Sequence, residues 1–99
     1  MTDYKSKQEI KNKLKIFFEA YHQTKIIDPG NDGIFKTHIL LSKNKNKTPK
    51  EKLINYKLLR VNERLFSSDS EDISMKDSII CEFLVDELIK YVQKSAKFL

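Results

Sequence analysis

The 99-residue chain is short of several residue types, and each shortage excludes a class of protein. A lone cysteine, Cys81, cannot form a disulfide within the chain. No apolar run approaches the roughly 18 residues that a membrane-spanning helix needs. The N-terminal stretch MTDYKSKQEIKNK lacks the apolar segment of a signal peptide. We therefore expect an intracellular protein, cytoplasmic or nuclear, without a membrane span.

Glycine and proline are also scarce, with two of each, and both glycines fall in the stretch DPGNDG at 28–33. If Asp28 began a calcium loop, Asp32 and Gly33 would fit the pattern. Gly30 and Ile39 would then occupy positions that need oxygen ligands, so the motif fails. Phosphate-binding glycine motifs are absent as well. The stretch therefore predicts a helix stop and a turn, with glycines that tolerate positive φ, and no metal site.

Apolar residues at helical spacing mark three long helices. The first spans 4–27, with Ile10, Leu14, Phe17 and Tyr21 on one stripe. The second, 49–65, begins with TPKE, in which Thr48 is the N-cap, Pro49 the first helical residue and Glu51 the partner in a capping box. The third runs from 75 to about 97 after an acidic, serine-rich connector. With 39% apolar residues, the chain has enough for one modest core, and we predict a single domain, 1–99.

The segment IFKTHILLS, at 34–42, fits either a short helix or a strand. As a helix it pairs Ile34 with His38 and Phe35 with Ile39, whereas as a strand it puts Phe35, Thr37 and Ile39 on one face. A lone strand has no partner, so a strand here would require a hairpin with residues 56–65. The fold class predicted is mainly α, a small bundle of three long helices plus this segment, with an α+β fold containing the 34–42/56–65 hairpin as the alternative.

Residues that carry catalytic or metal chemistry are few. Glu19 and His22 form half of a di-metal carboxylate motif, without the second copy that such a site needs. Cys81 has two candidate bases, His22 and His38, but it lies among Ile79, Ile80 and Phe83, where a thiol stays protonated. We expect a core cysteine, no catalytic residues, no metal, no cofactor and no small-molecule substrate.

The charge is divided between the two halves of the chain. Residues 1–66 carry 15 basic and 7 acidic residues, whereas 67–99 carry 4 and 7. The basic half suggests an anionic partner such as nucleic acid. However, Arg60 and Arg64 are the only arginines among the 19 basic residues, and arginine is favoured for reading bases and phosphates. The candidate nucleic-acid contacts are Lys7, Lys11, Lys15, Lys43, Lys45, Lys47, Lys50 and Lys52.

The last helix carries an apolar arc that is wider than the stripe of about 100° that one side of a bundle covers. Part of this arc should therefore stay uncovered, and Ile79, Phe83 and Phe98 are the candidate partner-binding residues. Ser68, with Glu71 three residues on, is a candidate phosphorylation site in the connector. The function expected is a non-enzymatic interaction subunit or regulator that docks on a larger protein or on a second copy. Nucleic-acid binding through the lysines is the alternative.

Overall fold

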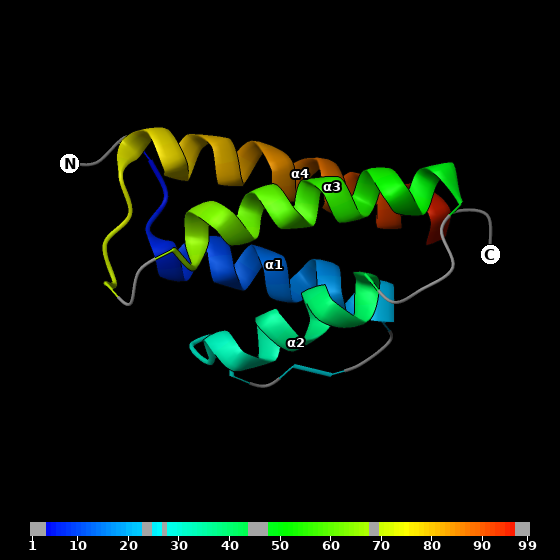
Figure 1. Cartoon of the computed structure of the whole chain (residues 1–99), viewed down its shortest axis with the longest axis horizontal. Helices are drawn as coiled ribbons and strands as arrows, with labels where there is room; N and C mark the ends of the chain where they lie inside the picture. The colour runs from blue at the N-terminus through cyan, green and yellow to red at the C-terminus, as the bar shows by residue number, and fades with distance from the viewer. Residues whose placement is uncertain (1–3, 23–24, 27, 44–47, 68–69, 97–99) are drawn as a thin grey trace.

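The computed structural model describes residues 4–22, 25–26, 28–43, 48–67 and 70–96, and at 22, 41–43 and 94–96 it describes the backbone alone. These ranges form four helices: α1 (Lys7–His22), α2 (Asp32–Lys43), α3 (Pro49–Leu65) and α4 (Met75–Ala96). Helices α1, α2 and α4 run in one direction and α3 runs in the other (Figure 1). The prediction of a mainly α bundle is confirmed. The described residues form four helices, whereas three long helices and one short ambiguous segment were predicted.

The segment 34–42 lies inside α2, and 56–65 lies inside α3, so the hairpin alternative is wrong. The N-terminal cap of α2 explains why residues 34–42 form a helix. Asn31 Oδ1 accepts the N–H of Gly33 at 3.0 Å, and the Asn31 carbonyl accepts that of Ile34 at 3.1 Å. This cap satisfies helical donors before the apolar residues begin. Phe35, His38 and Ile39 then share the buried face at helical spacing.

Residues 28–31 of the stretch DPGNDG form the predicted turn, whereas Asp32 and Gly33 already begin α2, and neither glycine has a left-handed φ. Asp28 Oδ1 accepts the N–H of Gly30 at 2.9 Å, which folds the chain over the carboxylate. A Cβ at Gly30 would stand 3.2 Å from that oxygen, and one at Gly33 would stand 3.1 Å from Asn31 Oδ1. Close approach of these side-chain oxygens, rather than φ, is therefore what favours glycine at both positions.

The ends of α1 differ from the prediction of 4–27. The helix begins after Ser6, whose Oγ accepts the N–H of Glu9 at 3.1 Å while Glu9 Oε1 accepts the N–H of Ser6 at 3.2 Å. This is a second capping box, and it sets the start at Lys7. At the other end the helix stops at His22, and Glu19 accepts the N–H of buried Ile26 at 3.2 Å as the chain turns away. For α3 the predicted bounds and the Thr48 cap are confirmed.

All four helices contribute to one buried core. Helix α4 packs against α1 on one side and α3 on the other, while α2 closes the bundle against α3 and α1. The largest fully buried side chains of this core are Ile10, Leu14, Phe17, Phe18, Phe35, Leu58, Val61, Leu65, Cys81, Val85 and Leu88. Within the described residues, no helix has the length and apolar content to cross a membrane.

Candidate partner-binding surface

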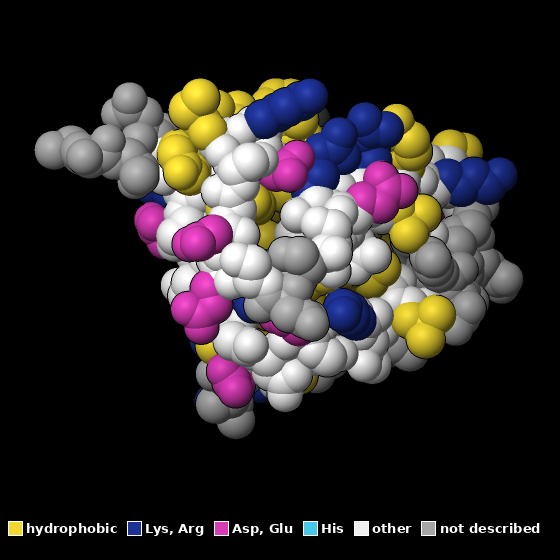
Figure 2. All heavy atoms as spheres, turned by 60° about the vertical axis from the view of Figure 1, so that its left-hand side comes forward, with side chains coloured by type: hydrophobic (Ala, Val, Ile, Leu, Met, Phe, Trp, Pro, Cys, Tyr) yellow, Lys and Arg dark blue, Asp and Glu magenta, His cyan; other side chains and the backbone are white. Residues whose placement is uncertain are grey.

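Helix α4 exposes a row of large apolar side chains on three successive turns. Met75, Ile79 and Phe83 are 55%, 52% and 63% exposed, although all three lie at i, i+4 spacing on a helix whose other side is in the core. The exposure expected for Ile79 and Phe83 is confirmed, while Phe98 lies outside the described residues. Met75 was missed, although its spacing to Ile79 gave the signal. Hydrophobic side chains gather along the upper edge of Figure 2, where α4 begins.

Helix α3 runs antiparallel to α4. Two contacts fix the register: Arg64 Nε lies 3.7 Å from Asp77 Oδ1, and Cys81 Sγ lies 4.0 Å from the Val61 carbonyl oxygen. Met75, Ile79 and Phe83 each lie two residues from Asp77 or Cys81, so they point away from α3. We name the row of Met75, Ile79 and Phe83 the α4 face.

Arg60 is held in place on α3 by Tyr56. Its guanidinium carbon lies 5.3 Å from the ring centroid of Tyr56, and its Nη1 donates a 3.0 Å hydrogen bond to the Tyr56 hydroxyl. Tyr56 is 55% exposed, so it serves as a platform on the surface and does not anchor the core. Because Arg60 both stacks on Tyr56 and hydrogen-bonds to its hydroxyl, the Arg60 side chain has little conformational freedom on the surface.

Carboxylates border the α4 face. Glu82 lies one residue before Phe83 and Asp86 three residues after it, and both lie 2.9 Å from Lys13 Nζ. Burial lowers the pKa of Lys13, but the hydrogen bonds with Asp86 and Glu82 outweigh it and raise the pKa above 10.5. By contrast, Lys57, Arg60 and Lys76 have no carboxylate within 4.0 Å among the side chains that are described. Lys or Arg side chains lie beside hydrophobic ones along the upper part of Figure 2.

The lysines predicted to meet nucleic acid are not gathered on one surface. Lys7 is only 5% exposed, and its Nζ donates a 2.8 Å hydrogen bond to the Ser70 carbonyl. Lys11 is 8% exposed, pairs with Asp32 and lies 5.9 Å over the Phe66 ring. Lys15 lies 3.8 Å from Glu19. Long aliphatic stems let Lys7 and Lys11 reach these partners from the edge of the core, so their role here is in packing.

The other lysines predicted to contact nucleic acid are Lys43, Lys45, Lys47, Lys50 and Lys52. Lys50 and Lys52 are exposed at the start of α3. Lys45, Lys47 and the candidate phosphorylation site Ser68 lie outside the described residues, as does the side chain of Lys43. The structure therefore gives no continuous basic surface that joins Lys7, Lys11 and Lys15 to Lys50 and Lys52.

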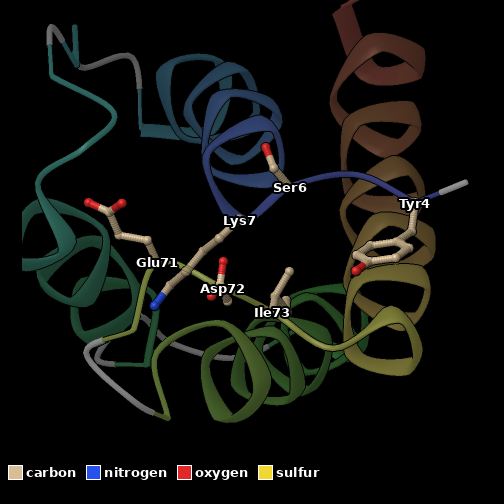
Figure 3. Close-up of a pocket in the computed structure, with 6 residues that line it drawn as sticks. All are labelled: Tyr4, Ser6, Lys7, Glu71, Asp72 and Ile73. Carbon is tan, nitrogen blue, oxygen red and sulfur yellow. The ribbon is translucent and has the colours of Figure 1, made fainter. Parts of the chain in front are cut away.

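A hollow of about 420 Å³ lies where the N-terminal segment meets the connector to α4 (Figure 3). Tyr4, Ser6, Lys7, Glu71, Asp72 and Ile73 line it. Two of its polar groups already have structural roles, because Ser6 caps α1 and Lys7 binds the connector backbone. No sequence motif could have revealed the hollow, since its two sides, residues 4–7 and 71–73, lie far apart in the sequence.

The candidate catalytic groups are held in the core. Cys81 is fully buried, and burial raises the pKa of its thiol to about 11. His38 is 7% exposed and stacks 5.2 Å from Phe18, and burial lowers its pKa. The side chain of His22 lies outside the described residues. No group of three His, Cys, Asp or Glu side chains that could hold a metal ion occurs in the described part of the chain.

These features define a small helical bundle with a row of apolar side chains exposed on α4. No protein-family model, curated protein or solved structure matches the chain. Its function must therefore be inferred from the α4 face itself.

Proposed function

We propose that this protein is a small non-enzymatic interaction subunit that docks on another protein through the α4 face. The observation that carries the proposal is the row of Met75, Ile79 and Phe83, each more than half exposed on successive turns of α4. Single exposed apolar residues are ordinary, but large ones clustered together mark contact surfaces. Covering one such side chain contributes about 1.5–3 kcal/mol, so a partner that covers two or three gains appreciable affinity.

The row is not needed for folding of the bundle. The side of α4 that packs in the core is built by Cys81, Val85 and Leu88, which are buried. Phe83→Ala should therefore change the free energy of unfolding by less than about 0.5 kcal/mol, as surface substitutions usually do. Leu88→Ala, on the same helix, should cost about 2–5 kcal/mol because it leaves a cavity. Urea denaturation of the two variants separates a docking residue from a core residue.

Site-specific photo-crosslinking in the native host tests the docking itself. A photoreactive amino acid at position 83 should give one discrete adduct, and the same group at position 40 should give none. Leu40 is a matched control, because it is 57% exposed on α2, away from the α4 face. The adduct should shrink about tenfold when Ile79→Ala is added, since one apolar contact is then lost. Equal labelling from positions 83 and 40 would contradict the proposed function.

A further inference from the structure

The outward side of α3 carries cations around an exposed aromatic ring. The helix buries Ile54, Leu58, Val61 and Leu65 in the core, so its opposite side faces out of the bundle. The cations and the two exposed large hydrophobic residues of this side define what we name the α3 face: Lys50, Lys52, Leu53, Tyr56, Lys57 and Arg60.

The cations of the α3 face are not neutralised by their neighbours. None of the four lies within 4.0 Å of a carboxylate among the side chains that the structure describes. Of the two carboxylates on the helix, Glu51 is held in the capping box by Thr48, and Glu63 lies at the far end, beyond Arg60. The helix therefore offers an excess of positive charge to an anionic partner.

Tyr56 lies in the middle of these cations. It is 55% exposed, and its hydroxyl accepts a 3.0 Å hydrogen bond from Arg60 Nη1 while the guanidinium carbon lies 5.3 Å from the ring centroid. The ring and the guanidinium thus form a held platform that solvent still reaches. The bases of a single strand stack on exposed aromatic rings and on guanidinium planes, while its phosphates pair with cations. We propose that the α3 face binds single-stranded nucleic acid, an activity separate from docking through the α4 face.

The length of the α3 face suits a short stretch of single strand. From Lys50 to Arg60 the helix rises about 15 Å at 1.5 Å per residue. At about 3.4 Å per nucleotide, this length spans roughly four nucleotides. Lys50 and Lys52 precede Tyr56 along the helix and Lys57 and Arg60 follow it, so a base on the ring has cations for the phosphates on both of its sides.

Two other anionic partners use the α3 face less fully. A duplex keeps its bases paired and stacked inside, so Tyr56 would have no base to stack on. A membrane surface needs a broad apolar side that sinks below the headgroups. Leu53 and Tyr56 are the only large hydrophobic side chains of α3 that are exposed, which is too few for that mode of binding.

Fluorescence anisotropy with labelled oligonucleotides tests the proposal on the full chain. The probe is oligothymidine, and the matched probe is an abasic strand of the same length, which keeps the phosphates and lacks the bases. Oligothymidine should bind at least about fivefold more tightly, because stacking of one base is lost in the abasic strand. The logarithm of its affinity should fall with the logarithm of salt concentration with a slope near −3, at about −0.7 for each of four phosphates. Oligouridine should bind within about threefold of oligothymidine, since stacking tolerates either sugar and base.

Variants of the ring locate the stacking. Tyr56→Ala should weaken binding of oligothymidine about fivefold or more and leave the abasic strand unchanged. Tyr56→Phe keeps the ring and should keep most of the preference for oligothymidine. Phe83→Ala should bind both probes as the parent chain does, because the α4 face points away from α3. Circular dichroism checks that each variant keeps its helices.

Charge variants locate the phosphates. Lys57→Gln should reduce the magnitude of the salt slope by about 0.7, since one phosphate contact is lost. Lys5→Gln is the matched control with the same change of charge. Lys5 precedes α1, which lies diagonally across the bundle from α3 because each of the two packs against α2 and α4. Its loss should leave the slope unchanged.

Four results would overturn the proposal. Equal affinity for oligothymidine and the abasic strand would mean that the face attracts any anionic polymer and does not stack bases. Equal loss in Lys57→Gln and Lys5→Gln would mean that binding depends on net charge alone. Tighter binding of a duplex of the same length would assign the face to double-stranded nucleic acid. Failure to bind oligothymidine, together with binding to vesicles of anionic phospholipid that Tyr56→Ala weakens, would assign it to a membrane surface. None of these results bears on photo-crosslinking at position 83, which tests the proposed function by itself.

Discussion

At the scale of single residues, Cys81 shows how position sets reactivity. Its thiol is fully buried between α3 and α4, and burial raises its pKa to about 11. Because the thiolate is the reactive form, the folded protein should react with iodoacetamide near neutral pH only when it unfolds. Labelling followed by mass spectrometry should therefore track the population of unfolded chain as urea is added. Fast, complete labelling without denaturant would contradict the buried position.

His38 makes stability depend on pH. Burial lowers its pKa below the ordinary value of 6.5, so below that pH the unfolded chain binds more protons than the folded one. The stability contributed by neutral His38 is fully present above pH 6.5 and declines as the pH falls from there toward the folded pKa. The melting temperature should fall between about pH 7 and pH 5, above the range where most carboxylates titrate.

Two variants assign this pH dependence. His38→Gln should flatten the change in melting temperature, because the group that titrates is gone. His22→Gln removes the other histidine of the chain and should leave the slope in place. An unchanged slope in His38→Gln would show that another group is responsible.

The lysines of α1 show where reasoning from residue type was insufficient. They were predicted to contact nucleic acid, yet Lys7 and Lys11 are buried while Lys15 is half-buried beside Glu19. The partners of the two buried lysines, the Ser70 carbonyl and Asp32, lie far along the chain or beyond a turn. No local pattern contains that information, because it depends on how the connector and α2 fold back on α1.

At the scale of helices, local signals predicted the ends that depend on capping. Thr48 Oγ1 accepts the N–H of Glu51 at 3.2 Å and lies 3.2 Å from Glu51 Oε1, as the motif TPKE implies. The equivalent motif SKQE, which begins at Ser6, also marks a helix start. The predicted start of α1 at residue 4 did not take this motif into account and was therefore too early. For 34–42, the helical and strand patterns were equally good, and only Asn31 as a cap could have distinguished them.

Thr48→Ala tests how much the cap of α3 contributes. The hydroxyl oxygen satisfies one of the donors left unpaired at the helix start, so its loss should lower the free energy of unfolding by about 1 kcal/mol. Thr48→Ser keeps a hydroxyl and should cost only a small part of that. Urea denaturation of the two variants provides the comparison, and equal stability of Thr48→Ala and the parent chain would show that the cap does not contribute.

At the scale of the whole molecule, the candidate surface was only partly predictable. The excess width of the apolar arc on α4 predicted exposed Ile79 and Phe83, because one side of a helix can be covered by only so many neighbours. The side of α4 that stays uncovered depends on where α1 and α3 pack against it, and the sequence does not state that packing. The division of charge between halves of the chain was a poor guide, because the fold brings Lys13 of the basic half against Glu82 and Asp86 of the acidic half.

Helix α2 should be the least stable part of the bundle. It is the shortest helix, and it packs mainly against α3 and less extensively against α1, whereas α4 packs extensively against two helices. Its beginning is held by the ion pair between Asp32 and Lys11 and by Phe66, which stacks on Phe35 at 6.1 Å and lies 5.9 Å from both Lys11 Nζ and Lys36 Nζ. Elements with few buried contacts open without global unfolding. Amide hydrogens in the middle of α2 should therefore exchange faster than those around Cys81 and Val85 in α4.

Asp32→Asn should widen this difference. The substitution leaves the Lys11 ammonium buried without its carboxylate and removes a negative charge from the N-terminal end of α2. Because Asp32 is itself partly exposed, a loss of about 1–2 kcal/mol is expected, which corresponds to roughly tenfold faster exchange in α2. Glu63→Gln on α3, an exposed carboxylate without a described ion pair, is the matched control and should leave exchange unchanged. Faster exchange throughout all four helices in Asp32→Asn would instead mean that α2 opens only when the entire bundle unfolds.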